Sequence, residues 1–282
     1  MKKILVLLTL FYLTISMASA AHFIIGKVNN ALDGTSANDK QIVLWNPLNG
    51  ISDNLSEIIG INGNSGVANT YMADCELLGT PCNVGNNLSI TVLNSGDNYI
   101  SETINVSVTG FGFDLAQNLT LNSPPNITSI LVEDSIFSPL NQIDLIAASN
   151  RTVVCNASVE EFDGQNIQNA SAQFFHSSSF SGDSVDNNYH YTNSSCLINS
   201  SYGGENESQI VCHFFVMYYA NSGNWTCELY LEDNFSVAST KNDSTYVNPL
   251  LSIGVASTLN YGNVDTTNIS NESILNITNY GN

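Results

Sequence analysis

Six cysteines are the residues of this chain whose chemistry is most readily anticipated. All of them lie after residue 20, at Cys75, Cys82, Cys155, Cys196, Cys212 and Cys227. An even number of cysteines in an exported chain favours disulfide bonds. Cys75 and Cys82 bracket a short loop, while Cys196 and Cys212 flank a turn rich in Ser, Asn and Gly. Locality therefore predicts these two pairs and leaves Cys155 to pair with Cys227.

The alternation of side chains around the third pair agrees with that assignment. Val153, Cys155 and Ala157 would share one face of a strand, and Trp225 and Cys227 one face of another. Both cysteines then point toward a core, so a buried bridge between two sheets is expected. Zinc binding is the competing interpretation. It is disfavoured because no C-x2-C pair exists and the four histidines are scattered.

A search for catalytic groups finds no recognisable set. Acyl transfer needs a nucleophile beside an oriented base, and the chain has no G-x-S-x-G elbow. The histidines are His22, His176, His190 and His213, none of them beside a nucleophile motif. There is also no P-loop and no G-x-G-x-x-G. We therefore predict that the chain is not an enzyme, with a hydrolase acting through Asp163 or His213 as the weakest alternative.

Clustered acidic residues raise the question of a cation. Carboxylates and Asn carbonyls suit Ca²⁺, and paired carboxylates also serve glycosidases. Two groups qualify, namely Glu160, Glu161 and Asp163 with Asp233, and Asp183 with Asp186. Neither has the spacing of an EF-hand, and both sit in stretches typical of turns. No cofactor or metal is predicted, and calcium remains the minority interpretation.

Asparagine in N-x-S/T sequons is the second abundant chemical feature. The sequon asparagines are Asn54, Asn87, Asn105, Asn118, Asn126, Asn150, Asn156, Asn169, Asn193, Asn199, Asn206, Asn224, Asn234, Asn242, Asn268, Asn271 and Asn276. This is roughly twice the number that the Ser and Thr content would give by chance, which favours a glycosylated exterior. The alternative is that Asn, Ser and Thr crowd together in β-turns.

Charge excludes two classes of partner. After residue 20 the only cations are Lys27, Lys40, Arg151 and Lys241, against 25 acidic residues in the chain. Nucleic acids and anionic membrane surfaces are bound by Lys and Arg. Neither is therefore expected as a partner.

The first twenty residues resemble a secretory signal. Lys2 and Lys3 precede a nearly unbroken apolar run, and Ala18-Ser19-Ala20 supplies the small residues of a cleavage site. Cleavage before Ala21 is expected, with a short N-terminal anchor as the alternative. No later stretch approaches the length of a transmembrane helix, so no further membrane span is predicted.

The remaining chain is expected to be all-β, because short alternating runs are separated by Asn, Gly, Ser and Asp clusters. Residues 21–122 form a first predicted unit. Its candidate strands are Phe23–Val28, Gln41–Trp45, Ala68–Met72, Leu88–Leu93, Thr103–Thr109 and Leu115–Leu121. Ser123-Pro124-Pro125 is a stiff break, so residues 123–128 are predicted to be a linker.

The first unit contains four short motifs, at Ile25–Val28, Ala31–Gly34, Ile42–Leu44 and Gly63–Gly66. In these motifs it resembles the carboxypeptidase regulatory-like, transthyretin-type sandwich. It implies a small seven-stranded sandwich used as a spacer or adhesion module. Some bacterial surface sandwiches of this type carry an internal Lys–Asn crosslink, and Lys27 lies on the strand where such a lysine would sit.

Residues 129–249 form a second predicted unit. Its candidate strands are Ser129–Val132, Gln142–Ala147, Thr152–Val159, Ala172–Phe175, Tyr189–Thr192, Ile210–Tyr219, Gly223–Leu231 and Ser236–Ala238. The spacing of Cys155 and Cys227 and the Trp225-Thr226-Cys227 ending resemble an immunoglobulin-like domain. That family usually has Tyr where this chain has Trp225, so the resemblance implies the sandwich architecture rather than membership.

Residues 250–282 do not look like a finished domain. They repeat Asn-Tyr-Gly-Asn at residues 260–263 and 279–282. We predict the first strands of a third β unit, in a fragment of a longer protein, with a strand pair docked on the second unit as the alternative.

Taken together, the layout resembles the Asn/Ser/Thr-rich, multidomain secreted surface proteins of archaea. It implies a non-catalytic structural or adhesive protein of the extracellular cell surface, whose partners are other surface proteins or extracellular glycans. The alternative is a carbohydrate- or peptide-binding accessory module of an exported enzyme. Fold alone does not separate the two.

Overall fold

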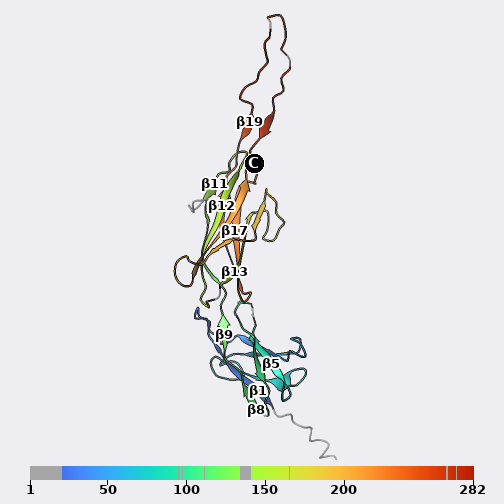
Figure 1. Ribbon diagram of the computed structural model, residues 1–282, viewed down its shortest axis with the longest axis vertical. Coiled ribbons are helices and arrows are strands. Elements are labelled where there is room, and N and C mark those ends of the chain that lie inside the picture. Colours follow the sequence, from blue (N-terminus) through green and yellow to red (C-terminus); the bar gives the residue numbers. More distant parts are fainter. Residues whose placement is uncertain are drawn as a thin grey trace, which may run out of the picture. The chain divides into compact units, whose positions relative to one another are not determined.

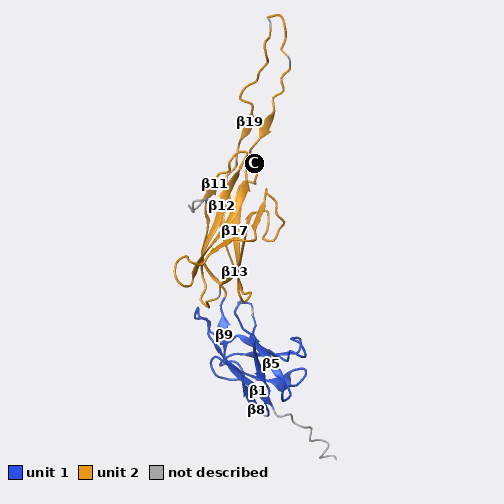
Figure 2. Ribbon diagram, in the orientation of Figure 1, with its two compact units in different colours: residues 1–123 blue, residues 124–282 orange. Residues whose placement is uncertain are grey.

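A computed structural model describes residues 21–93, 96, 98–110, 112–133, 141–164, 166–264, 266–270 and 272–282. The predicted signal segment, residues 1–20, lies outside the described residues. The chain divides into two compact units, residues 1–123 and 124–282, shown in different colours in Figure 2. Their secondary structure is almost entirely β, with one short 3₁₀ turn at Cys75–Leu77 among the described residues. The predicted all-β class with tandem β-sandwiches is confirmed.

The first unit consists of two sheets. One contains β1 (His22–Asn29), β4 (Thr70–Asp74), β6 (Ile100–Ser101), β8 (Gly112–Leu115) and β9 (Leu119–Asn122) in the order β4-β1-β9-β6, with β8 also paired to β1. The other contains β2 (Gln41–Trp45), β3 (Asn54–Ile58), β5 (Asn87–Val92) and β7 (Ile104–Ser107) in the order β3-β2-β5-β7. Figure 1 labels four of these strands.

Alternation along the strands fills the core between these sheets. On β1, Ile24 and Val28 are fully buried, while Ile25 and Lys27 lie on the other face. On β5, Leu88 and Ile90 are fully buried as well. Because side chains of a strand alternate between faces, the apolar residues at every second position commit each strand to one orientation.

Two strand predictions for this unit were wrong. The run Leu115–Leu121 is two strands, β8 and β9, which pair with different parts of β1. Residues 54–58, not predicted as a strand, form β3 opposite β2. β3 escaped notice because its face pattern is only half-buried, with Asn54 and Ser56 exposed.

The second unit also has two sheets. The first contains β10 (Asn126–Glu133), β12 (Asn150–Glu160), β15 (Leu197–Asn199) and β16 (Glu207–Met217) in the order β10-β12-β16-β15. The second contains β11 (Gln142–Ile143), β13 (Ile167–His176), β14 (His190–Asn193), β17 (Gly223–Asp233) and β18 (Ala238–Val247) in the order β11-β18-β17-β13-β14.

Three boundaries differ from expectation here. Residues 126–128 belong to β10, so the predicted linker 123–128 is too long. The run Gln142–Ala147 contributes only the two-residue β11. The expected short strand Ser236–Ala238 overlaps β18 only at Ala238, and β18 continues to Val247. β18 is largely polar and half-exposed, so its sequence lacks the apolar alternation of a strand.

The disulfides join Cys75 to Cys82, Cys155 to Cys227 and Cys196 to Cys212. These are the pairs that locality and parity indicated. Cys155 lies on β12 and Cys227 on β17, so this bond connects the two sheets of the second unit. Cys196 and Cys212 tie β15 to β16, and Cys75 and Cys82 close a loop of the first unit.

Aromatic side chains pack beside the inter-sheet bond. Trp225 is fully buried, and its ring stacks on Phe174 with 5.0 Å between centroids. Phe214 from the opposite sheet lies 5.7 Å from Phe174. The Trp225 Nε1–H donates to the carbonyl of Asn221 at 2.8 Å, which satisfies the one polar group of the indole.

Side chains of β18 cover the outer edge of β10. Lys241 Nζ donates to the carbonyls of Ile127 and Thr128, at 2.7 and 2.9 Å. Asp243 accepts from the N–H of Val132 at 3.0 Å. These bonds occupy backbone groups that would otherwise form an open sheet edge.

The tail forms a separate two-stranded ribbon of β19 (Ile253–Val255) and β20 (Ile277–Asn279), labelled by β19 in Figure 1. Both Asn-Tyr-Gly-Asn copies make the same turn. Asn260 Oδ1 accepts from the N–H of Gly262 at 2.8 Å, and Asn279 Oδ1 from that of Gly281 at 2.9 Å. Within the described residues this segment is a two-stranded ribbon grouped with the second unit.

We expect the inter-sheet disulfide to contribute the most stability. Replacing Cys155 and Cys227 by Ala should lower the free energy of unfolding by about 4 kcal/mol, because the bond closes a long loop. The same replacement at Cys75 and Cys82 should cost about 2 kcal/mol, because that loop is short. The sequence separations are 72 and 7. Urea unfolding of both double variants compares them, and equal losses would contradict the loop-length argument.

The hydroxyl of Tyr71 makes no hydrogen bond among the described residues, although this side chain is fully buried. Burial raises its pKa, so the phenol stays neutral. Tyr71→Phe should therefore increase the free energy of unfolding by about 1–2 kcal/mol, since it removes an unsatisfied polar group. Tyr99→Phe is the matched control. Tyr99 Oη bonds Asp33 and Thr35, so its loss should destabilise the fold in the same thermal unfolding experiment.

Candidate functional site

The sequons follow the strands of both units. Eleven of the seventeen asparagines lie within named strands, and where the whole sequon lies in the strand its Asn and its Ser or Thr share one face while the middle residue lies on the other. Val106, Ile127 and Trp225 are such middle residues, with exposed fractions of 6%, 6% and 0%. The sequon spacing of two residues thus coincides with the side-chain period of a strand.

Most sequon asparagines face solvent. Those with exposed side chains are Asn54, Asn87, Asn105, Asn118, Asn126, Asn150, Asn169, Asn199, Asn206, Asn224, Asn234, Asn242, Asn268 and Asn276. Asn271 lies outside the described residues. An exposed side-chain amide on a folded surface leaves room for a bulky modification.

Asn156 and Asn193 are the exceptions, because both are half-buried and their Nδ2 groups are engaged. Asn156 Nδ2 donates to Glu133 Oε2 at 2.8 Å, and its Oδ1 accepts from Gln209 at 2.9 Å. Asn193 Nδ2 donates to the carbonyl of His213 at 3.1 Å. A substituent on either nitrogen would break these bonds, so these two sequons serve the fold.

The first acidic group predicted as a calcium alternative is used to shape turns. Glu160 Oε2 accepts from Asn126 Nδ2 at 3.0 Å, and Glu161 Oε1 from the N–H of Asp163 at 3.3 Å. Asp233 is fully buried, and its Oδ1 accepts from the N–H groups of Phe235 and Val237, at 2.8 and 2.9 Å. Local backbone bonds therefore account for Glu161 and Asp233, and a cross-strand bond from Asn126 accounts for Glu160.

Asp183 and Asp186 act in the same way within the loop of residues 177–189. Asp183 Oδ2 accepts from the N–H of Phe180 and from Ser179 Oγ, at 2.8 and 2.9 Å. These two bonds hold the pKa of Asp183 below its usual value, and the bond from the backbone of Phe180 has the larger effect. Asp186 Oδ1 accepts from the N–H of Asn188 at 2.8 Å. Within the described ranges, no group of three or more His, Cys, Asp or Glu is placed to hold a metal ion.

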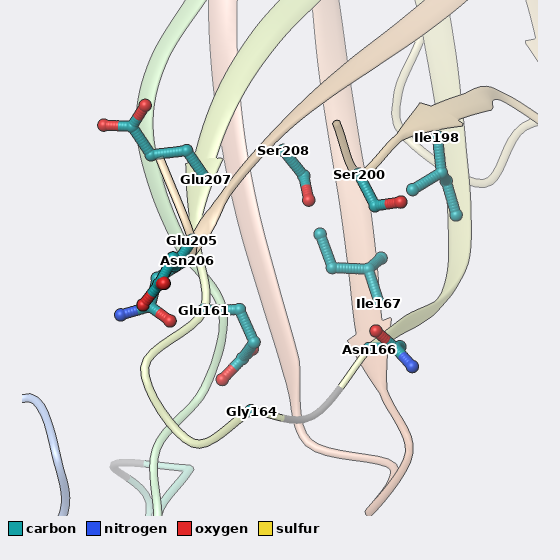
Figure 3. Close-up of a pocket in the computed structure, with 10 residues that line it drawn as sticks. All are labelled: Glu161, Gly164, Asn166, Ile167, Ile198, Ser200, Glu205, Asn206, Glu207 and Ser208. Carbon is teal, nitrogen blue, oxygen red and sulfur yellow. The ribbon is translucent and has the colours of Figure 1, made fainter. Parts of the chain in front are cut away.

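A hollow of about 380 Å³ lies between the loop after β12 and the start of β16. Glu161 and Glu205 line it with Ile167 and Ile198, whereas Glu207 directs its carboxylate away from Glu161 (Figure 3). Glu207 Oε2 instead accepts from the N–H of Gly204 at 2.9 Å. The acidic groups at this hollow therefore do not converge on a common point.

The structure brings together a serine, a histidine and an aspartate that the sequence did not connect. Ser179 Oγ lies 3.2 Å from His190 Nδ1 and donates to Asp183. Since the serine proton goes to Asp183, His190 Nδ1 carries its own proton toward Ser179. In a hydrolytic triad the acid orients the histidine and the histidine activates the serine. Here the acid binds the serine, so the arrangement braces the loop.

His190 is fully buried and stacks on Phe175. Its Nε2 has no hydrogen-bond partner among the described residues. Burial lowers the pKa of His190, and the nearby Asp183 only partly opposes this. The sequence signal for this site was the close spacing of Ser179, Asp183 and His190 around one loop, which a search for named motifs passes over.

A second buried pair was also missed. His22 Nε2 lies 2.7 Å from Asp114 Oδ2, and both side chains are less than 10% exposed. Burial alone would raise the pKa of Asp114, but hydrogen bonds from Thr109 and His22 outweigh it and lower that pKa. The pair fastens β1 to β8.

Lys27 does not fit an internal crosslink. Its side chain is exposed on β1, whereas the core face of that strand carries Ile24 and Val28.

Among the residues the structure describes, no helix has the length and apolarity to span a bilayer.

Comparison with known proteins gives fold-level similarity. No protein-family model matches the chain, and no curated protein matches it. A variant of BcpA, the major pilin subunit of Bacillus cereus, is 10% identical with a TM-score of 0.42, covering 93% of this chain and 84% of that one. The major pilin SpaD of Corynebacterium diphtheriae is 8% identical with a TM-score of 0.37, covering 86% and 69%.

A third similar structure is the dimeric latent PorU of Porphyromonas gingivalis. It is 12% identical with a TM-score of 0.31, covering 82% of this chain and 23% of that one. All three TM-scores lie below 0.5, so these similarities say nothing about activity or partners.

Acidification should destabilise the second unit through His190. Its pKa is lower in the folded chain than the value of about 6.5 in an unfolded one, so the unfolded state binds the proton more readily. The free energy of unfolding should therefore fall as the pH drops from about 7 to about 5. His190→Phe, which keeps a ring against Phe175, should flatten this part of the profile. An unchanged slope in the variant would exclude His190 as the source.

Proposed function

We propose that this chain is a non-catalytic, N-glycosylated structural or adhesive protein of the extracellular cell surface. The observation that carries the proposal is the outward direction of fourteen sequon asparagines over the sheets and turns of both units. A protein whose exposed strand faces carry such sites presents a modified surface rather than a single cleft.

The covalent framework supports an oxidising compartment. All six cysteines are paired in three bonds, and none is free. Structural disulfides persist outside the reducing cytosol. The formal net charge of −19 favours solubility and disfavours anionic partners, so other surface proteins and extracellular glycans are the partners we propose.

We include the domain types in the proposal. The bond between β12 and β17, with Trp225 packed beside it, supports an immunoglobulin-like second unit. The two-sheet arrangement of the first unit is compatible with a transthyretin-type sandwich. We also propose that residues 1–20 act as a signal that directs the chain to secretion.

Glycopeptide mass spectrometry on the protein isolated from its own cells tests the proposal. The intact mass should exceed that of the polypeptide, and glycans should map to the exposed sequons. Asn156 and Asn193 should be unmodified, because they are half-buried and their Nδ2 groups are bonded within the fold, whereas Asn54 and Asn126, whose Nδ2 groups are also bonded, face solvent. The six cysteines should resist alkylation until a reductant is added. Unmodified asparagines at every exposed sequon would overturn the proposed glycan coat.

Two variants give a matched comparison. Asn87→Gln should remove one glycan and leave the melting temperature nearly unchanged, because the Asn87 side chain is exposed at the start of β5. Asn156→Gln should leave the mass of attached glycan unchanged but lower the free energy of unfolding by about 1–2 kcal/mol, since Glu133 and Gln209 lose their partner. Loss of a glycan in the Asn156 variant would contradict the distinction drawn between the two classes of sequon.

A further inference from the structure

The tail ribbon has one face fixed to the second unit. Tyr280 lies against Tyr218, with 6.0 Å between ring centroids, and a Cβ on Gly254 would collide with the Tyr280 ring. Asn282 Nδ2 donates to the carbonyl of Ala220 at 2.7 Å, and its Oδ1 accepts from the N–H of Leu250 at 2.6 Å. Tyr280 and Gly254 thus define the face of the ribbon that is directed inward.

The opposite face is apolar and exposed. Ile253 and Val255 alternate with Gly254, and Val255 lies opposite Ile277 in the ladder. With Leu251, which has the same parity, these side chains form a surface that we call the ribbon face. Their exposed fractions are 94% for Leu251, 69% for Ile253, 57% for Val255 and 66% for Ile277. Exposed apolar residues continue along the tail at Leu259, Tyr261, Ile269 and Ile274.

This apolar area is large enough for an interface. The four residues of the ribbon face expose on the order of 500 Å², and together with the four further tail residues the exposed apolar area is on the order of 1,000 Å², whereas the largest apolar patch of a typical monomer is about 300–600 Å². A standard protein interface buries about 800 Å² on each partner. The tail therefore exposes what one side of a stable complex would bury.

The ribbon also lacks the protection that the chain provides elsewhere. Residues 250–264 contain no Asp, Glu, Lys, Arg or Pro. The edge of β10, by contrast, is covered by Lys241 and Asp243 of β18. Natural sheets avoid uncontrolled association by such charges and covers, so their absence here marks a surface intended for contact.

We infer that the ribbon face is a self-association surface whose partner is the ribbon face of a second copy of this chain. The two faces pack against each other about a two-fold axis, so that Ile253, Val255 and Ile277 interdigitate with the same residues of the partner. Self-complementary surfaces of this kind are isologous contacts. The inference goes beyond the proposed function. It is compatible with a glycan on Asn276, because this residue has the parity of Thr278 and Gly254 and so lies on the face opposite Ile277 and Val255.

Charge explains why a second copy is the favoured partner. The chain has a formal net charge of −19, but residues 250–282 contain only Asp265 and Glu272 and no cation. Two copies therefore repel each other over most of their surfaces and least at the tail. A basic or acidic partner would find no complementary charge on the ribbon face, whereas a second ribbon matches it in polarity.

Sedimentation equilibrium of the full, unglycosylated recombinant chain tests this inference. The wild type should form a dimer at micromolar concentration. The variant carrying Ile253→Asp and Ile277→Asp should associate at least about tenfold more weakly, because carboxylates would be buried between the faces. Its melting temperature should match that of the wild type, since both positions are exposed.

Leu48→Asp is the matched control, because Leu48 is 89% exposed in the first unit. It should dimerise like the wild type. A monomeric wild type, or a dimer that persists in the double variant, would overturn the inference. Binding of the monomer to phosphatidylcholine vesicles, lost in the double variant, would overturn it in favour of a membrane-directed face. Equal weakening by Leu48→Asp would assign the association to general apolar contacts and would also overturn it.

Discussion

The bond between Cys155 and Cys227 is the constraint on which the second unit depends. It crosses from β12 to β17 and so fixes the separation and relative position of two sheets that share no backbone hydrogen bonds. Trp225 and Phe174 fill the space beside it, and both are fully buried. In a chain of this composition, in which polar Asn, Ser and Thr occupy the outer faces, the inward residues and this crosslink supply most of the cohesion.

The same alternation that builds the core also determines the surface chemistry. Every second residue of a strand faces outward, and in this chain those positions are frequently Asn followed two residues later by Ser or Thr. The middle residue of a sequon on a strand therefore faces the core, as Trp225 does in Asn224-Trp225-Thr226. The β-sandwich and the sequon array are two consequences of one pattern, which is why the surface proposed to carry glycans extends over both units.

Some sheet edges of the described chain are covered by side chains, whereas the tail ribbon is not. Along β10, side chains of β18 bond directly to the exposed backbone, and Asn193 does the same for β16 through the carbonyl of His213. The tail ribbon has no such cover among the described residues and carries apolar side chains on its outward face. The acidic charge of the remaining chain restricts close approach of two copies to this region. In this proposal the tail ribbon mediates association, and the acidic surface of the remaining chain keeps the copies apart elsewhere.

The sequence by itself determined the all-β class, most strand positions and the nature of the surface, because these follow from local alternation and from composition. It also indicated the disulfide pairs, since two were local and the third followed from parity. It failed at β3 and β18, whose faces are polar or half-exposed, because alternation is weak where little is buried. The tertiary structure adds that this pairing does not follow from ladder proximity, because Cys212 lies directly opposite Cys155 across the β12–β16 ladder while Cys227 lies across the core. It alone brought Ser179, Asp183 and His190 together, and His22 to Asp114, because these contacts depend on how loops return and which strands become neighbours. The direction of the ribbon face was likewise decided by the packing of Tyr280 on Tyr218, a contact between residues 62 positions apart that no local pattern encodes.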